Sequence, residues 1–142
     1  MLYGIGCDLC EVARMEKSLS GAHGPAFVRR VFGPAEQAAL GLGAEAEPWP
    51  ARRASAHKAA SAAADFAAKE AFLKAAGTGL AAPFSLCEIE AVRLPSGAPN
   101  YRFSGKTAEW VAAHHLTAKL SLSHDGGMAL AFCTLEQLPP ET

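Results

Sequence analysis

The chain has 142 residues, of which 50% are hydrophobic and 19% are charged, and its formal net charge is −1. This composition predicts one domain over residues 1–142 with a buried core, and the lack of a basic excess argues against a nucleic acid as partner. The sequence has no apolar run near the ~20 residues that span a membrane and no signal peptide at its start, so we expect a cytoplasmic protein without membrane attachment and with mostly reduced cysteines.

The first element predicted is a buried strand over residues 1–7, because "LYGIGC" is apolar and contains two glycines that allow close backbone approach. Asp8 follows at the end of this strand. The next segment, "EVARMEKSL", has apolar residues at helical spacing and predicts a helix over residues 11–19, for which Asp8 is a candidate cap.

Further helices are predicted before residue 77. A short one covers residues 26–32, and another begins at Pro34, since proline is favoured in the first turn. Glycine and proline predict a loop over residues 41–50. The alanine-rich stretch 51–76 predicts a long helix that ends at Gly77.

The second half of the chain has the pattern of strands. Strands are predicted for 85–94 and 101–105, a helix for 106–115, and two strands for 118–124 and 128–135, joined by the hairpin signal "DGG". The predicted fold class is therefore α+β, with a long helix packed on a mainly antiparallel sheet.

A candidate site lies at the end of the long helix. Glu70 and Lys74 are four residues apart and therefore share one face, just before the turn Gly77-Thr78-Gly79. If Asp8 lies beside Glu70, two carboxylates share one site, which is costly unless a cation lies between them. Oxygen ligands of this kind favour Mg²⁺, which also binds phosphates, and Lys74 would add a point charge for the same phosphates. Taken alone, a Glu–Lys pair on a helix is more often a weak surface ion pair.

A second candidate segment is "SLSHDGG", in which His124 ends a strand and Asp125 begins the turn. One interpretation is a hairpin with a surface histidine. The functional interpretation is a histidine that faces phosphate, with Asp125 near a metal.

Three separated motifs in this chain, "GIGCDLCEVAR", "FAAKEAFLKAAGTG" and "LSLSHDGGMALAF", resemble the holo-acyl-carrier-protein synthases. These are the short AcpS-type 4′-phosphopantetheinyl transferases. Order, spacing and length agree over nearly the whole chain, and the central motif is the most specific of the three. The resemblance implies the phosphopantetheinyl transferase fold and a homotrimer with active sites at subunit interfaces.

The resemblance also implies a reaction. Family members transfer 4′-phosphopantetheine from coenzyme A to a serine of apo-acyl carrier protein and release adenosine 3′,5′-bisphosphate, in the service of fatty acid and in some cases polyketide biosynthesis. By motif position, Asp8 and Glu70 would hold Mg²⁺ on the diphosphate of coenzyme A. Lys74 would neutralise the phosphate and the leaving oxygen, and either Glu70 or a metal-ordered water would act as general base.

Other residues have implied binding roles. The residues placed at the coenzyme A site are Lys74, Gly77, Thr78, Gly79, His124 and Asp125, with His124 reaching across the subunit interface. Arg14 corresponds to the family arginine that meets the acidic helix of the carrier protein, and Phe27, Arg29 and Arg30 lie nearby in the sequence.

This chain departs from the family pattern at two positions. Asp65 stands where family members commonly have a basic residue, which puts one contact to the adenosine 3′-phosphate in question; Arg52, Arg53 or Lys58 are candidate substitutes. Gly33 stands where the family has threonine, so a helix cap is expected to be lost.

Three alternatives remain at the level of sequence. A hot-dog-type coenzyme A thioesterase would also be a small α+β oligomer, and a non-catalytic module could hold a nucleotide or carrier protein. The third alternative is a redox or zinc site at Cys7 and Cys10, but no second C-x-x-C is present. We instead expect Cys7 to be a buried strand residue and Cys10 to lie on a packed helix face.

Overall fold

The computed structural model describes residues 1–43 and 55–139. The elements in chain order are β1 (Leu2–Glu11), α1 (Val12–Ser20), α2 (Gly24–Val31), α3 (Pro34–Leu40), α4 (Ser55–Ala76), the 3₁₀ turn η1 (Leu86–Glu88), β2 (Ile89–Arg93), β3 (Pro99–Phe103), α5 (Gly105–Ala113), β4 (Leu116–Asp125) and β5 (Met128–Gln137). The predicted α+β class is confirmed. Most of the predicted loop over residues 41–50 and the first residues of the stretch 51–76 lie outside the described residues.

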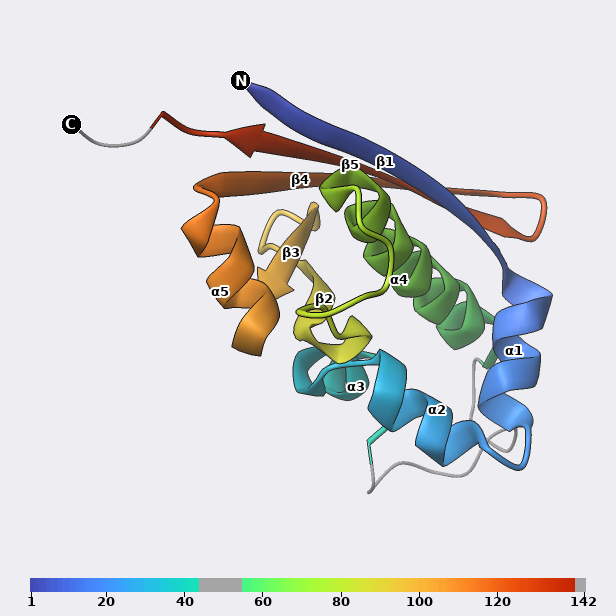
Figure 1. Ribbon diagram of the computed structural model, residues 1–142. Coiled ribbons are helices and arrows are strands. Elements are labelled where there is room, and N and C mark those ends of the chain that lie inside the picture. Colours follow the sequence, from blue (N-terminus) through green and yellow to red (C-terminus); the bar gives the residue numbers. More distant parts are fainter. Residues whose placement is uncertain (44–54, 140–142) are drawn as a thin grey trace.

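The main layer is a three-stranded antiparallel sheet in the order β1-β5-β4. Helix α4 crosses one face of this sheet (Figure 1). A separate antiparallel pair, β2-β3, lies on the other side of α4. The long helix is thus packed between the sheet and the β2-β3 hairpin. Its packing on an antiparallel sheet agrees with the predicted architecture.

Strand β1 is longer than the sequence predicts. It pairs with β5 as far as Glu11 opposite Met128, and the N–H of Val12 donates to the carbonyl of Gly127 at 2.9 Å. These long-range hydrogen bonds keep residues 8–11 extended, although their side-chain pattern also suits a helix. Asp8 therefore lies within the strand, and it does not cap α1, whose N-cap residue is Glu11 without a side-chain hydrogen bond.

The glycines of β1 allow the strand to lie directly on α4. A Cβ at Gly4 would overlap the carbonyl oxygen of Ala75, and a Cβ at Gly6 would overlap that of Ala71. Both alanines are buried in α4. The expectation of close backbone approach at the two glycines is confirmed.

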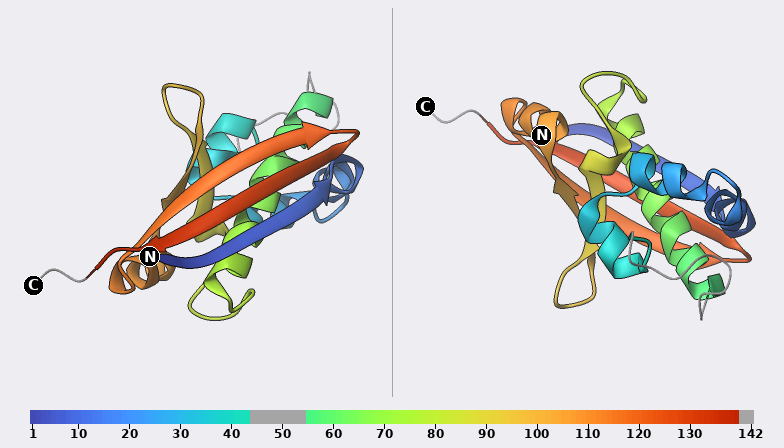
Figure 2. Two further views of the ribbon diagram at one scale, coloured as in Figure 1. Left: turned by 90° about the horizontal axis from the view of Figure 1, so that it is seen from above. Right: turned by 90° about the horizontal axis from the view of Figure 1, so that it is seen from below.

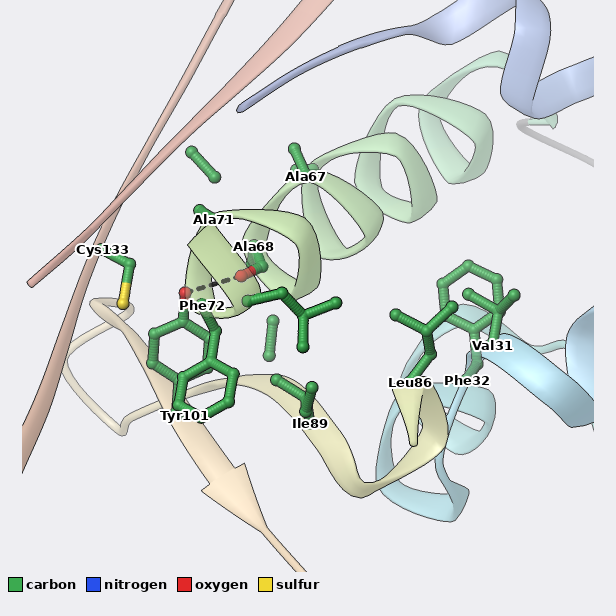
Figure 3. Close-up of a cluster of buried hydrophobic side chains, with 14 of the residues drawn as sticks. Val31, Phe32, Ala67, Ala68, Ala71, Phe72, Leu86, Ile89, Tyr101 and Cys133 are labelled. Carbon is green, nitrogen blue, oxygen red and sulfur yellow. Dashed lines mark hydrogen bonds between the residues drawn. The ribbon is translucent and has the colours of Figure 1, made fainter. Parts of the chain in front are cut away.

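The core on the other side of α4 is aromatic. Phe72 packs against Phe84, Tyr101 and Phe103, with ring centroids 4.9–5.9 Å apart. The hydroxyl of Tyr101 donates to the carbonyl of Ala68 at 2.7 Å, which satisfies the polar tip of this buried ring (Figure 3). Helix α4 is therefore fixed on both faces.

A buried ion pair fixes α4 to α3. The ammonium of Lys69 contacts the carboxylate of Glu36 and donates to the carbonyl of Ile89 at 2.6 Å. Beside this pair, an oxygen of Glu90 accepts the backbone N–H of Glu36 at 3.0 Å, and the Glu90 side chain fills the space that a Cβ at Gly33 would need. The cap expected to be lost at Gly33 is thus supplied by Glu90 from β2.

One other difference concerns the second half of the chain. The segment predicted as a strand over 85–94 begins as the turn η1, and only Ile89–Arg93 is extended. The predicted hairpin is confirmed, since Gly126 and Gly127 join β4 to β5 with φ of 54° and 78°, as a tight two-residue turn requires.

Among the described residues, no helix is both long and apolar enough to cross a membrane.

Candidate active site

The structure brings together three of the site residues predicted from sequence, and the first contact joins β1 to α4. The Nζ atom of Lys74 lies 3.1 Å from Oδ1 of Asp8 and donates to the carbonyl oxygen of Cys7 at 3.0 Å. The side chain of Asp8 is 19% exposed and that of Lys74 is 56% exposed, so the pair lies at the surface edge of the helix–strand contact. Lys74 pairs with Asp8 and not with Glu70, its neighbour on the helix.

Glu70 completes this group. Its carboxyl is half-buried, and burial raises its pKa above the ordinary value, with a further increase from the negative charge of Asp8 and a decrease from Lys74. No hydrogen bond or ion pair within residues 1–43 and 55–139 satisfies the Glu70 carboxylate. Asp8 and Glu70 therefore form the shared acidic site that the sequence predicts, with one ammonium for two carboxylates.

The donor set suits a hard divalent cation. Asp8 and Glu70 offer carboxylate oxygens, and Mg²⁺ binds through one or two carboxylates while keeping several waters and taking substrate phosphates. The described part of the chain contains no group of three His, Cys, Asp or Glu side chains arranged to hold a metal. The residues present thus fit a magnesium ion shared with a ligand and do not form a closed protein cage.

The turn after α4 is open to solvent. Gly77 ends the helix with φ of 84° and donates its N–H to the carbonyl of Leu73 at 3.1 Å, which confirms the predicted helix end. Thr78 and Gly79 are exposed, one turn beyond Lys74. Their backbone is accessible to a ligand bound at Asp8, Glu70 and Lys74.

His124 and Asp125 do not join this group within one protomer. On β5, Ala131 pairs with Asp8 of β1 on one side and with Leu122 of β4 on the other. His124 of β4 pairs with Ala129, which in turn pairs with Cys10 and not with Asp8. Two strand spacings, about 10 Å, separate His124 from β1. Both residues are exposed, and no hydrogen bond or ion pair in the described ranges links either one to the acidic site.

Arg14 lies on the exposed side of α1. Basic side chains continue onto α2, where Arg29 and Arg30 are exposed and the Arg30 guanidinium lies 5.9 Å from the centre of the Phe27 ring. A groove of about 310 Å³ between the two helices is lined by Lys17, Ser18, Gly21, Ala22, His23, Ala26, Phe27 and Arg30. This surface is therefore basic with an apolar floor.

Asp65 faces away from the acidic site. It is 5% exposed, and its Oδ1 atom lies 4.0 Å from Nη1 of Arg93 on β2. Burial raises the pKa of Asp65 to about 8. Of the candidate basic substitutes, Lys58 donates to the carbonyl of Ala39 at 3.3 Å, and Arg52 and Arg53 lie outside the described residues.

The two cysteines of the C-x-x-C differ from expectation. Cys7 is exposed and not buried, and Cys10 is a half-buried strand residue and not a helix residue. Because the side chains of a strand alternate, residues 7 and 10 point to opposite faces of the sheet and cannot bind one metal or form a disulfide together. The contribution of Cys7 to the site is its carbonyl oxygen, a backbone feature that no residue pattern signals.

Comparison with known proteins shows the family. A profile of the 4′-phosphopantetheinyl transferase superfamily matches residues 4–133. The holo-acyl-carrier-protein synthase of Methylobacterium sp. (strain 4-46) is 40% identical over 147 residues, which cover 100% of this chain and 99% of the relative.

Solved structures are similar over the same extent. The crystal structure of holo-acyl-carrier-protein synthase from Neisseria meningitidis has a TM-score of 0.78 at 28% identity and covers 96% of this chain and 100% of its own. The holo-acyl-carrier-protein synthase from Bacillus anthracis in complex with CoA (3′,5′-ADP) has a TM-score of 0.70 at 29% identity and covers 97% of this chain and 99% of its own.

These matches extend over all the elements that build the acidic site. They overturn the alternatives of a hot-dog thioesterase and of a module without catalytic activity. The chain belongs to the 4′-phosphopantetheinyl transferase superfamily, as an enzyme of the holo-acyl-carrier-protein synthase type.

Proposed function

We propose that this enzyme transfers 4′-phosphopantetheine from coenzyme A to a serine of apo-acyl carrier protein, requires Mg²⁺, and releases adenosine 3′,5′-bisphosphate. The observation that carries the proposal is the convergence of Asp8, Glu70 and Lys74 at the contact between β1 and α4. The complex of the Bacillus anthracis relative with CoA supports coenzyme A as the substrate.

The proposed chemistry depends on positioning and charge. Asp8 and Glu70 would hold a magnesium ion, which would neutralise part of the negative charge of the diphosphate. Lys74 has three donors on an exposed, flexible side chain, and it would neutralise the attacked phosphate and the leaving oxygen. The serine proton passes to the Glu70 carboxylate or to a water held beside it.

The remaining site residues would bind the nucleotide end of coenzyme A. The exposed turn Gly77-Thr78-Gly79 would pass close to the nucleotide, with its backbone as the contact surface. His124 and Asp125 would contact coenzyme A from a neighbouring subunit, because about 10 Å separate β4 from β1 within one protomer.

A homotrimer would bring such a neighbour into place. The face of the sheet that α4 does not cover carries Ile5, Leu9, Leu130 and Phe132, which are 39–60% exposed. The left view of Figure 2 shows this face with no helix in front of it. Exposed apolar side chains gathered on one face mark an interaction surface, and other copies of this chain would cover it.

The basic surface of α1 and α2 would receive the acidic helix of the carrier protein. Arg14 is the main contact in this proposal, and Arg29 and Arg30 extend the same surface. We place the reaction in the cytoplasm, in fatty acid biosynthesis and for some carriers in polyketide biosynthesis.

Chromatography of the released nucleotide tests the proposed reaction. With coenzyme A, Mg²⁺ and apo-carrier protein, the enzyme should release adenosine 3′,5′-bisphosphate in amounts equal to the carrier consumed, and EDTA should stop the release. Release that continues in EDTA would contradict the role of the metal, and no release with any of several carriers would contradict the function.

A further inference from the structure

Lys74 occupies one of the two carboxylate oxygens that Asp8 could offer to a metal. Its Nζ atom makes two contacts of ordinary hydrogen-bond length, to Oδ1 of Asp8 at 3.1 Å and to the carbonyl oxygen of Cys7 at 3.0 Å. Both acceptors belong to adjacent residues of β1. The ammonium is thus held at one defined position beside Asp8.

The charges at this position do not balance. Two carboxylates, Asp8 and Glu70, stand against the single ammonium of Lys74, and Glu70 has no ion-pair partner within the described residues. A divalent cation between the carboxylates would neutralise both of them. The ammonium would then be a surplus positive charge a few ångströms from the metal, and like charges at that distance repel each other.

Lys74 can leave this position at little cost. Its side chain is 56% exposed, and an ion pair with that exposure contributes little to stability. It lies in the last turn of α4, next to the exposed turn Gly77-Thr78-Gly79, where a diphosphate would bring negative charge.

We propose that Lys74 is a placeholder for the metal at Asp8, and that it moves to the diphosphate of coenzyme A when the divalent cation binds. This inference depends on the proposed function of the site. The movement makes the binding of metal and of coenzyme A cooperative, because coenzyme A offers the ammonium a new partner and frees the Asp8 oxygen.

The test measures metal affinity in the absence of catalysis. Mn²⁺ is titrated into the wild-type enzyme and the Lys74→Met variant, with and without coenzyme A, and free Mn²⁺ is followed by electron paramagnetic resonance. Methionine matches the apolar four-atom stem of the lysine side chain and lacks its charged end. Lys74→Met should bind Mn²⁺ about two- to tenfold more tightly than wild type without coenzyme A, and coenzyme A should tighten Mn²⁺ binding less in the variant than in the wild type.

Lys106→Met is the matched control, since Lys106 is exposed at the start of α5 and makes no hydrogen bond or ion pair in the described part of the chain. It should bind Mn²⁺ as the wild type does. The placeholder role is overturned if Lys74→Met binds Mn²⁺ no more tightly than wild type, or if Lys106→Met gives the same gain. If the wild type binds no Mn²⁺ even with coenzyme A, the proposed metal site itself is overturned.

Discussion

Gly6 on β1 lies against the carbonyl oxygen of Ala71 on α4, so closely that any side chain at position 6 would overlap that oxygen. Gly6 precedes Asp8 by two residues, and Ala71 directly follows Glu70. The contact therefore sets the separation of the two carboxylates that form the acidic site.

The substitution Gly6→Ala should separate β1 from α4. We expect a loss of about 1–3 kcal/mol in the free energy of unfolding, because the added methyl group overfills a packed contact. The transfer rate should also fall, since Asp8 moves relative to Glu70. Urea denaturation and the rate of carrier modification check these two effects. Gly43→Ala is the control, because a Cβ there meets no atom of residues 1–43 and 55–139 within 4 Å. Equal stability of the two variants would contradict this account of the contact.

The substitution Glu70→Gln should remove one metal ligand with little change in shape. We expect the transfer rate to fall by about 100-fold or more, because the charge of the bound diphosphate is no longer balanced. The midpoint temperature of thermal unfolding should be unchanged or slightly higher, since the half-buried charge is removed. A variant that folds and retains the wild-type rate would refute the role assigned to Glu70.

The substitution Asp65→Asn should change stability in a pH-dependent way. Burial raises the pKa of Asp65 from 3.8 to about 8 in the folded state; the negative charges of Glu36 and Glu90 raise it further, and Arg93 and Lys69 lower it. The folded state therefore binds this proton more tightly than the unfolded state. The stabilisation is fully present below pH 3.8 and is lost as the pH rises through about 8.

Asparagine resembles the protonated acid at all pH values. Asp65→Asn should therefore be more stable than wild type by at least about 1 kcal/mol at pH 8 and nearly equal to it in acid. Urea denaturation across this pH range measures the difference, and Glu109→Gln, an exposed change on α5, is the control. A constant difference between variant and wild type at all pH values would contradict the burial argument.

The substitution Arg14→Ala should weaken the encounter with the carrier protein and leave the chemistry intact. Because Arg14 is an exposed cation on α1, we expect kcat/KM for the carrier to fall about 3- to 30-fold, with kcat nearly unchanged and less dependence on salt. Steady-state kinetics at two ionic strengths measures both effects. A fall in kcat alone would place Arg14 at the reacting groups and not at the docking surface.

The acidic site could be found in the sequence because its residues are marked by local spacing. Glu70 and Lys74 are one helical turn apart, and Asp8 follows an apolar run with two glycines. The pairing between them could not be predicted. Lys74 turns to Asp8 because β1 lies directly on α4, and that contact is long-range.

Other features were missed for a similar physical reason. The pairing of Glu11 with Met128 extends β1 beyond its apolar run, so Cys7 is exposed on one face and Cys10 faces the other. The cap at Gly33 comes from Glu90, 57 residues later in the chain, through a buried carboxylate. Both features depend on tertiary contacts that no local pattern records. The single domain over residues 1–142, the roles of the site residues and the homotrimer stay predictions.

Intact-mass spectrometry of the carrier protein tests the central claim most directly. Apo-carrier, coenzyme A and Mg²⁺ are incubated with the wild-type enzyme and, separately, with Asp8→Asn at equal concentration of folded protein. The account predicts that the wild type adds the mass of one phosphopantetheine group to each carrier, and that Asp8→Asn adds almost none in the same time. An unmodified carrier with the wild type, or complete modification by Asp8→Asn at the wild-type rate, would contradict it.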